Sequence, residues 1–165
     1  MRIALCSDTF TPQVNGVTTV LRRMVQAITE SGHQVVVVAP RYPSPTRDGA
    51  ARELRIPSVA FPPYPAIRLS LPQLGRVDRF LAEFSPDLIH VATEGPLGFV
   101  CRRWALRADL PLVTSFHTDF PRYCRDYRVR TLESVVWRWL TWFHKPARLT
   151  HTPGEAIKAQ LERRG

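Results

Sequence analysis

The sequence predicts an α/β fold in which helices cover both faces of a doubly wound, mostly parallel sheet of six to seven strands. Two observations predict this fold. Residues 34–39 (QVVVVA) form an unbroken apolar run, which is typical of a strand that is covered on both faces. Along the chain, short apolar runs alternate with longer segments of helical periodicity, the order expected of right-handed β-α-β crossovers.

The strands are predicted from apolar runs of four to six residues that end in turn-forming residues. The first run, RIALCS, opens the chain. The segment 40–65 is rich in proline and turn residues, and it predicts only one short strand. The expected strands are residues 2–7, 34–39, 53–56, 87–91, 112–116 and 148–151.

The first helix is the best defined of the predicted helices. Leu21, Val25 and Ile28 are spaced so that they share one face, together with Met24. Asn15 is a suitable N-cap, and Gly32 suits the position just past the C-terminus. The expected helices are residues 17–31, 71–84, 97–108, 131–143 and 155–163.

Composition and length indicate one ordinary globular domain that spans residues 1–165. The chain is 44% hydrophobic and 22% charged, and it shows no repeat or flexible linker. No stretch reaches the about 18 consecutive apolar residues of a membrane-spanning helix. Asp8 interrupts the first apolar run before a signal-peptide core could form, so we expect a mature, cytoplasmic N-terminus.

Cysteine usage also suggests a reducing compartment. Cys6, Cys101 and Cys124 are odd in number and far apart, without a Cys-x-x-Cys pair. This pattern favours reduced thiols and argues against a structural zinc site, so we expect no metal.

The net charge of +9 is unevenly distributed. Residues 101–165 hold 13 Lys/Arg against 6 Asp/Glu, whereas residues 1–100 hold 10 against 8. The basic C-terminal third is expected to attract phosphates or an anionic surface. A merely solvated, arginine-rich face explains the same charge equally well.

The segment 112–123 (LVTSFHTDFPRY) is the most informative motif. Its apolar run ends at His117, which predicts that a buried parallel strand delivers an imidazole to the carboxyl edge of the sheet, where open α/β sheets bind ligands. His117 could contact a sugar or phosphate or act as a general base, or it could be a satisfied imidazole at a strand end. Asp119 could orient His117 or cap the next turn, and Arg122 and Tyr123 could meet an anionic acceptor. His90, by contrast, is expected in the core.

Two other segments follow strands in the same way. Residues 8–17 (DTFTPQVNGV) lack the G-x-G-x-x-G spacing, and no G-x-x-x-x-G-K-[ST] motif occurs in the chain. Gly16 nevertheless lies beside a helix N-terminus that suits a phosphate, although a simple capped helix is the alternative. Residues 92–98 (ATEGPLG) could place the Glu94 carboxylate in the same crevice, or Glu94 could only complement the helix dipole.

The helix at 131–143 is unusually aromatic. Its broad apolar face is expected to pack in the core and comprises Leu132, Val135, Val136, Trp139, Leu140 and Phe143. Trp137, Trp139 and Trp142 among basic residues also fit a helix that rests at a membrane interface.

Taken together, these motifs resemble the N-terminal domain of glycosyltransferase family 4, the retaining nucleotide-sugar transferases of the GT-B architecture. The matching residues are Asn15-Gly16-Val17, the turn from Glu94 to Gly98, Thr152-Pro153, and above all the run from His117 to Pro121. That run is most similar to the branch of bacterial α-mannosyltransferases and of sulfoquinovosyl- and glucosyl-transferases that act on lipids. The similarity covers essentially all 165 residues and implies a Rossmann-like domain.

The resemblance also implies roles for individual residues. His117 would be a catalytic residue in contact with the transferred sugar. The donor diphosphate would lie against Asn15, Gly16 and Val17. The acceptor would be faced by Asp8, Glu94, Gly95, Asp119, Arg122 and Tyr123.

Substrates and partners follow from the same resemblance. The donor would be a GDP- or UDP-linked hexose of the mannose or glucose type, and the acceptor a lipid or another glycan, with no bound cofactor, metal or nucleic acid. Complete family members hold the nucleotide in a second domain, so we expect this chain alone to be catalytically incomplete. The expected location is the cytoplasm, at the inner face of the cell membrane.

Two other interpretations remain open at the level of sequence. One is a non-enzymatic Rossmann-like module that binds an anionic membrane surface or polyanion through its Arg- and Trp-rich third. The other is a different Rossmann-type nucleotide-binding enzyme, which the missing glycine motif disfavours.

Overall fold

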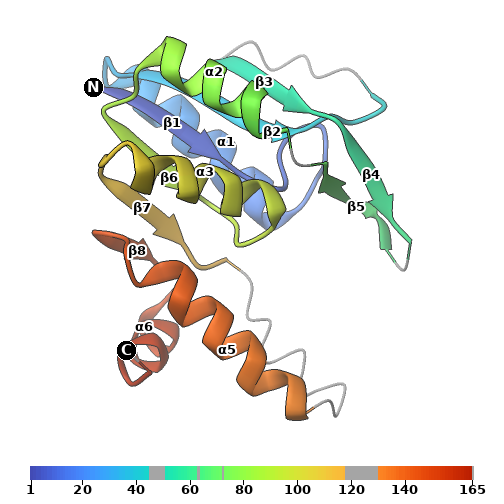
Figure 1. The fold of residues 1–165 in the computed structure, drawn as a ribbon, viewed down its shortest axis with the longest axis vertical. Coiled ribbons are helices and arrows are strands. Elements are labelled where there is room, and N and C mark those ends of the chain that lie inside the picture. The colour runs from blue at the N-terminus through green and yellow to red at the C-terminus, as the bar shows by residue number, and fades with distance from the viewer. Residues whose placement is uncertain (45–50, 63, 72, 118–129, 165) are drawn as a thin grey trace.

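The computed structural model describes residues 1–44, 51–62, 64–71, 73–117 and 130–164. Within these ranges, six parallel strands form one sheet in the order β3-β2-β1-β6-β7-β8, which confirms the predicted doubly wound α/β fold (Figure 1). The strands are β1 (Arg2–Cys6), β2 (Gln34–Pro40), β3 (Arg52–Ile56), β6 (Leu88–Val91), β7 (Leu112–Ser115) and β8 (Leu149–His151).

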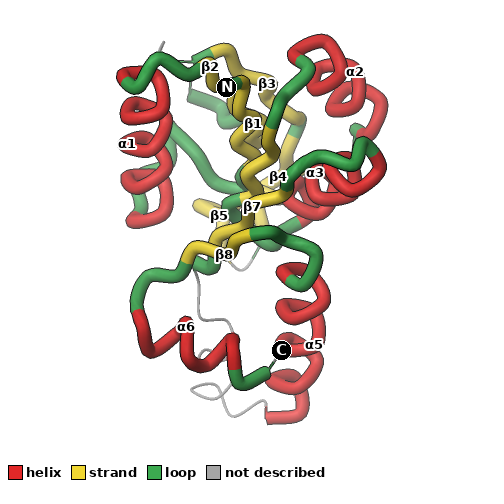
Figure 2. Tube along the Cα trace, turned by 90° about the vertical axis from the view of Figure 1, so that its left-hand side faces the viewer, coloured by secondary structure: helices red, strands yellow, loops and turns green. Residues whose placement is uncertain are grey.

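The helices form a layer on each side of this sheet. Helices α1 and α6 lie on one side, and α2, α3 and α5 lie on the other (Figure 2). No helix among the described residues has both the length and the apolar character needed to cross a membrane. The helices are α1 (Gly16–Glu30), α2 (Leu74–Phe84), α3 (Pro96–Arg107), α5 (Arg130–His144) and α6 (Glu155–Glu162).

Helix α1 begins and ends at the residues that the sequence indicates. Oδ1 of Asn15 accepts a hydrogen bond from the backbone N–H of Thr18 at 2.8 Å, which satisfies one N–H of the first turn. Gly32 follows the C-cap with a φ of +76°, a left-handed conformation that favours glycine.

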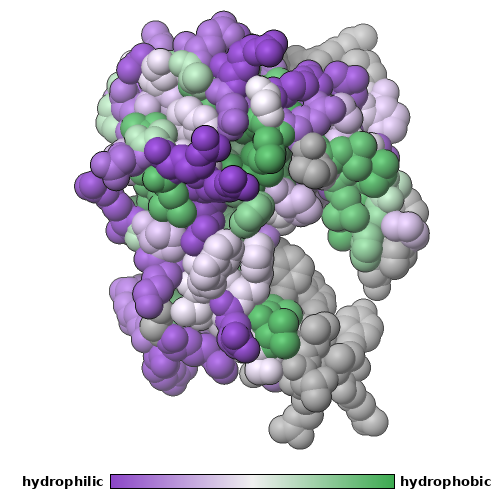
Figure 3. All heavy atoms as spheres, in the orientation of Figure 1, coloured by the Kyte–Doolittle hydropathy of each residue, from purple (hydrophilic) through white to green (hydrophobic). Residues whose placement is uncertain are grey.

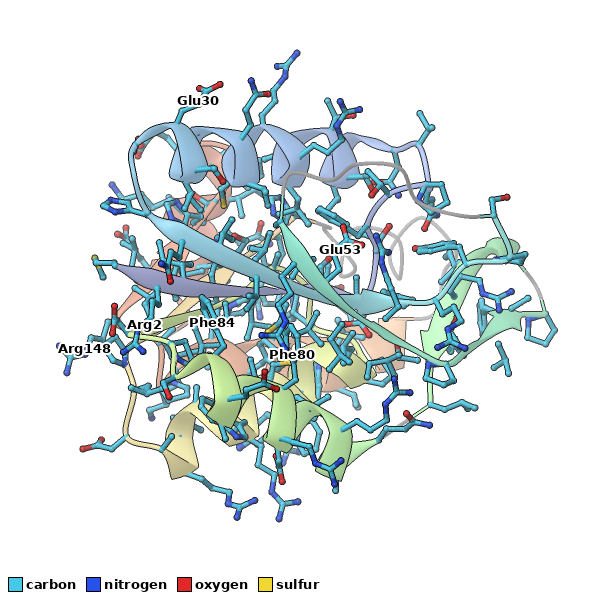
Figure 4. All side chains as sticks on the ribbon, turned by 90° about the horizontal axis from the view of Figure 1, so that it is seen from above. Arg2, Glu30, Glu53, Phe80, Phe84 and Arg148 are labelled. Carbon is cyan, nitrogen blue, oxygen red and sulfur yellow. The ribbon has the colours of Figure 1, made fainter. Side chains whose placement is uncertain are left out.

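Two apolar clusters fill the space on either side of the sheet. Val36 and Val38 of β2 pack in the cluster that faces α2 and α3, whereas Val35 and Val37 pack in the cluster that faces α1. This alternation explains why β2 reads as an unbroken apolar run. Figure 4 shows Phe80 of α2 between that helix and the sheet, while Glu30 projects outward from α1.

A two-stranded hairpin was missing from the sequence prediction. Strands β4 (Ser58–Phe61) and β5 (Tyr64–Ser70) pair antiparallel and extend beyond the sheet, and α2 begins at Leu74 instead of residue 71. Figure 3 shows hydrophobic surface over this hairpin, where Val59, Ile67 and Leu71 are exposed. Prolines in this segment led to the prediction of a loop, because proline weakens a strand pattern.

The packing of α5 also differs from the prediction. Trp137, Leu140 and Phe143 are buried, but Trp139 is 40% exposed and Val135 is 57% exposed. The predicted core face was therefore wrong for Val135 and Trp139. The helix buries a face rotated toward Trp137, because α6 packs there through Ile157 and Leu161 in a cluster with Phe116.

Candidate functional site

The candidate site lies where the winding of the sheet changes direction. The chain passes from β1 to β2 and β3 on one side, and from β6 to β7 and β8 on the other. Asp8 follows β1, Glu94 follows β6, and His117 follows β7, so all three leave the carboxyl ends of neighbouring strands. This switch point is where open α/β sheets form their ligand crevice.

Asp8 acts as a cap for α3 from a distant part of the chain. Its carboxylate accepts hydrogen bonds from the backbone N–H groups of Leu97 at 2.8 Å and Gly98 at 3.1 Å, and from Oγ1 of Thr93 at 2.9 Å. Burial raises the pKa of Asp8, these hydrogen bonds oppose that effect, and the charge of Glu94 adds to it. The hydrogen bonds described for the Asp8 carboxylate thus hold the start of α3 in place. Its contact with an acceptor stays a prediction.

Two glycines permit this close approach of α3. A Cβ atom on Gly95 would lie 2.5 Å from Cγ of Asp8, and one on Gly98 would overlap the carbonyl oxygen of Thr93. The contact with Asp8 therefore explains why residue 95 has no side chain. The prediction that Gly95 faces the acceptor stays a prediction.

Glu94 is buried and paired with a residue that sequence reasoning did not identify. Its Oε1 accepts a hydrogen bond from Nε2 of His144, the last residue of α5, at 3.2 Å. The other ring nitrogen of His144 lies 2.8 Å from Oγ1 of Thr114. The sequence indicates His144 only indirectly. Glu94 lies on a strand-to-helix turn, and a carboxylate that is buried there needs a hydrogen-bond partner.

His117 is half-buried at the same edge. Its Nε2 is inaccessible to solvent and has no hydrogen-bond partner among the described residues. Burial lowers the pKa of His117, and the charge of Glu94 partly opposes this effect. The ring is therefore neutral at pH 7, with one nitrogen that can donate and one that can accept.

Two further histidines surround this position. Nε2 of His90 lies 2.7 Å from Oγ of Ser115, and its ring centroid lies 5.6 Å from that of His151. Burial, together with the nearby His151 and His117, lowers the pKa of His90 to about 4. The prediction that His90 belongs to the core is confirmed, since it is buried.

The predicted diphosphate site lies at the first turn of α1. Gly16 is the first residue of that helix, and the space beside its Cα is open. The side chain of Asn15 is occupied by the cap and by a hydrogen bond from its Nδ2 to Thr9. The side chain of Val17 is partly buried and packs against the apolar cluster under α1.

The loop that precedes α1 is held by an arginine from β3. Nη1 of Arg55 donates to the carbonyl oxygens of Thr11 at 2.8 Å and Pro40 at 3.2 Å, and the guanidinium forms an ion pair with Glu53. Glu53 lies on the α1 side of the sheet (Figure 4). These contacts fix the loop between β1 and Gly16.

Other predicted site residues lie outside the described part of the chain. Asp119, Arg122 and Tyr123 fall within residues 118–129. Among the described residues, no group of three or more His, Cys, Asp or Glu side chains could hold a metal ion.

Comparison with known proteins decides the family. The sequence profile of Glycosyltransferase Family 4 matches residues 14–165. The chain belongs to glycosyltransferase family 4. The predicted resemblance is thereby confirmed, and the Gly16 and His117 motifs both lie within the matched residues.

Two relatives place this family 4 chain near enzymes of the predicted branch. A GDP-mannose-dependent alpha-mannosyltransferase of Mycobacterium tuberculosis is 31% identical over 171 residues, which cover 100% of this chain and 45% of that protein. An alpha-monoglucosyldiacylglycerol synthase of Streptococcus pneumoniae is 29% identical over 123 residues, which cover 74% of this chain and 28% of that protein. The chain therefore spans less than half the length of these relatives.

Solved structures support the fold. The UDP-GlcNAc 2-epimerase of Methanocaldococcus jannaschii superimposes with a TM-score of 0.55 and 14% identity, covering 99% of this chain and 42% of that one. At this identity the similarity concerns the Rossmann-like architecture alone.

Proposed function

We propose that this family 4 domain, residues 1–165, is the acceptor-side half of a retaining hexosyltransferase. The enzyme moves a mannose- or glucose-type sugar from a GDP- or UDP-linked donor to a lipid or glycan acceptor. A second domain outside these residues holds the nucleotide, in keeping with the greater length of the relatives. The observation that carries the proposal is the half-buried imidazole of His117 at the carboxyl edge of the sheet, near the charge of Glu94, with an Nε2 that has no hydrogen-bond partner among the described residues.

The geometry fits the charges that develop during transfer. The bond from the anomeric carbon to the diphosphate breaks while the acceptor oxygen bonds to that carbon, and the proton of the acceptor hydroxyl passes to the departing diphosphate oxygen. Negative charge grows on the diphosphate, and the N-terminus of α1 favours it there. Because Gly16 has no side chain and open space beside it, the diphosphate can approach the backbone of Gly16 and Val17.

His117 and Glu94 serve the sugar and the acceptor. The neutral, half-buried imidazole of His117 contacts the transferred sugar and holds its anomeric carbon toward the acceptor. Glu94, with Asp119, Arg122 and Tyr123, faces the acceptor. Asp8 and Gly95 shape the turn that carries Glu94, and they too face the acceptor.

The test is a transfer assay on the longest product of the gene and on the 165-residue chain. Radiolabelled GDP-mannose and UDP-glucose are offered with diacylglycerol, phosphatidylinositol or short mannosides, and the products are separated. We expect an α-linked product from one donor with the long form, and little or none with the 165 residues. No transfer from either donor to any acceptor, or robust transfer by the 165 residues alone, would contradict the proposal.

A second candidate function is binding to an anionic membrane surface, on the cytoplasmic side. We define the aromatic patch as Phe99, Trp139 and Trp142. Trp142 is 46% exposed, and the ring centroids of the two tryptophans lie 5.1 Å apart, next to Phe99. Indole side chains favour the membrane interface. Arg103 and Arg107 of α3, Arg138 of α5, and Lys145 just after α5 are exposed basic residues near the patch.

Vesicle sedimentation tests this candidate on the chain itself. Binding is expected to vesicles of phosphatidylcholine with phosphatidylglycerol, and to fall with salt, but not to pure phosphatidylcholine. The double substitution Trp139→Gln/Trp142→Gln should abolish it. Val20→Gln, which removes an equally exposed apolar residue from α1, is the control and should bind normally. Wild-type binding by the double variant would show that the aromatic patch does not bind the membrane.

A further inference from the structure

The buried pair of Glu94 and His144 joins two parts of the chain that are separated by 50 residues. Glu94 lies on the turn between β6 and α3, and His144 ends α5. Both side chains are buried, with exposed fractions of 5% and 8%. A buried carboxylate is costly unless it is hydrogen-bonded, so the hydrogen bond from His144 stabilises Glu94 in its buried position.

The ring of His144 is held from two sides. Because the carboxylate of Glu94 only accepts, Nε2 of His144 carries the proton of that hydrogen bond. Nδ1 then faces Oγ1 of Thr114 at 2.8 Å, and this hydroxyl lies 2.9 Å from Oγ1 of Thr150. In the neutral ring, Thr150 donates to Thr114 and Thr114 donates to Nδ1, so each hydroxyl and the imidazole are satisfied. The chain of contacts therefore fixes the direction in which Nε2 points.

The end of α5 is itself fixed to α3. Nε of the buried Arg102 donates to the carbonyl oxygen of Phe143, and Nη2 donates to that of Trp142, both at 2.8 Å. Carbonyl groups at a helix C-terminus lack partners within the helix, and a guanidinium from α3 supplies them here. His144 consequently has little freedom to move away from Glu94.

Resting on the proposed function, we infer that His144 is a positioning residue, which holds the Glu94 carboxylate toward His117 and the acceptor. It does not need to touch either substrate. Its effect passes through Glu94, whose charge acts on the ring of His117. Substitution of His144 should therefore lower the pKa of His117, as removal of the Glu94 charge does.

The direct test is an NMR titration of the His117 imidazole in the 165-residue chain, which needs no activity. The titratable groups that face His117 among the described residues are Glu94 on the turn, His151 at the end of β8 and His90 in β6. Glu94→Gln removes one favourable charge and should lower the pKa of His117 measurably further. His144→Phe should lower it by a similar amount, because the carboxylate of Glu94 without its partner turns away from the ring of His117.

Three further variants separate positioning from general disruption. His144→Gln retains an N–H donor for Glu94 and should keep the wild-type pKa of His117. His144→Phe combined with Glu94→Gln should add nothing to Glu94→Gln alone. His33→Phe removes a histidine near the N-terminus, where it contacts Met1, and should change nothing. Circular dichroism verifies the fold of each variant.

The outcomes distinguish this inference from the proposed function. A pKa of His117 unchanged by His144→Phe, or additive effects of the two substitutions, would overturn the positioning role even if the enzyme transfers sugar. In the longest gene product, His144→Phe and Glu94→Gln should raise KM for the acceptor together, with recovery in His144→Gln. An NMR result as expected, without any transferase activity, would retain the positioning of Glu94 and reject the reaction.

Discussion

Gly98→Ala should strongly destabilise the protein, because α3 approaches the β6–α3 turn too closely for a side chain. A Cβ atom at residue 98 would overlap the carbonyl oxygen of Thr93 and lie 3.1 Å from Cγ1 of Val91. Backbone must move by more than about 1 Å to restore a carbon–oxygen contact of about 3.3 Å. Such overpacking costs about 1–3 kcal/mol. The same movement breaks the hydrogen bond from Gly98 N–H to Asp8, for about 1.5–3 kcal/mol more.

The expected loss is therefore about 3–5 kcal/mol of unfolding free energy, measured by urea denaturation with circular dichroism and tryptophan fluorescence. At about 2–4 °C per kcal/mol, the melting temperature should fall by roughly 10 °C. Gly75→Ala is the matched control, since Gly75 lies in the first turn of α2 with open space around it, and this variant should stay within about 0.5 kcal/mol of wild type. A Gly98→Ala protein within about 0.5 kcal/mol of wild type would refute the described packing of α3.

Three other substitutions test separate parts of the account. Gly16→Ala should leave the melting temperature unchanged within about 2 °C, because the added Cβ meets open space. The same variant should raise KM for the nucleotide-sugar donor, since the Cβ occupies the space proposed for the diphosphate. An unchanged KM would show that Gly16 does not contact the diphosphate. In the folded protein the pKa of His90 is lowered to about 4, from an ordinary value of 6.5. The unfolded chain therefore binds a proton at His90 before the folded protein does. The stability that depends on the neutral ring is complete above pH 6.5 and is lost as the pH falls from 6.5 to 4. His90→Gln should therefore flatten the pH dependence of unfolding by about 3 kcal/mol over that range, whereas parallel curves for wild type and variant would contradict the assignment. Arg102→Ala should lower the free energy of unfolding by about 2–4 kcal/mol in urea denaturation, because the carbonyl groups of Trp142 and Phe143 lose their hydrogen bonds to Arg102. A loss below about 1 kcal/mol would show that these hydrogen bonds contribute little to stability.

The sheet and the first helix could be predicted because their signals are local. The valines of β2 alternate between two clusters, and that arrangement is visible as an unbroken apolar run. Asn15 and Gly32 mark the ends of α1 through short-range backbone geometry. Such features depend on neighbours within a few residues and need no knowledge of the tertiary structure.

The features that could not be predicted depend on contacts between distant segments. His144 meets Glu94 only because Arg102 and α6 set the position of α5, and no local pattern contains that information. The exposure of Trp139 has the same origin, since periodicity identifies an apolar face but not which part of it the neighbouring helix covers.

Asp8 illustrates how a correct location can accompany an unexpected contact. The sequence placed it after the first strand, at the edge where the site was expected. Its carboxylate caps α3, which begins 88 residues further along the chain. A residue type that suits both an acceptor contact and a helix cap cannot be assigned from its position alone.

The turnover number of the His117→Ala variant in the longest gene product tests the central claim most directly. If the carboxyl edge of β1, β6 and β7 holds the reacting sugar, kcat should fall by about 100-fold or more, with the melting temperature unchanged within about 2 °C. A variant that folds normally and transfers sugar at the wild-type rate would show that the reaction takes place elsewhere.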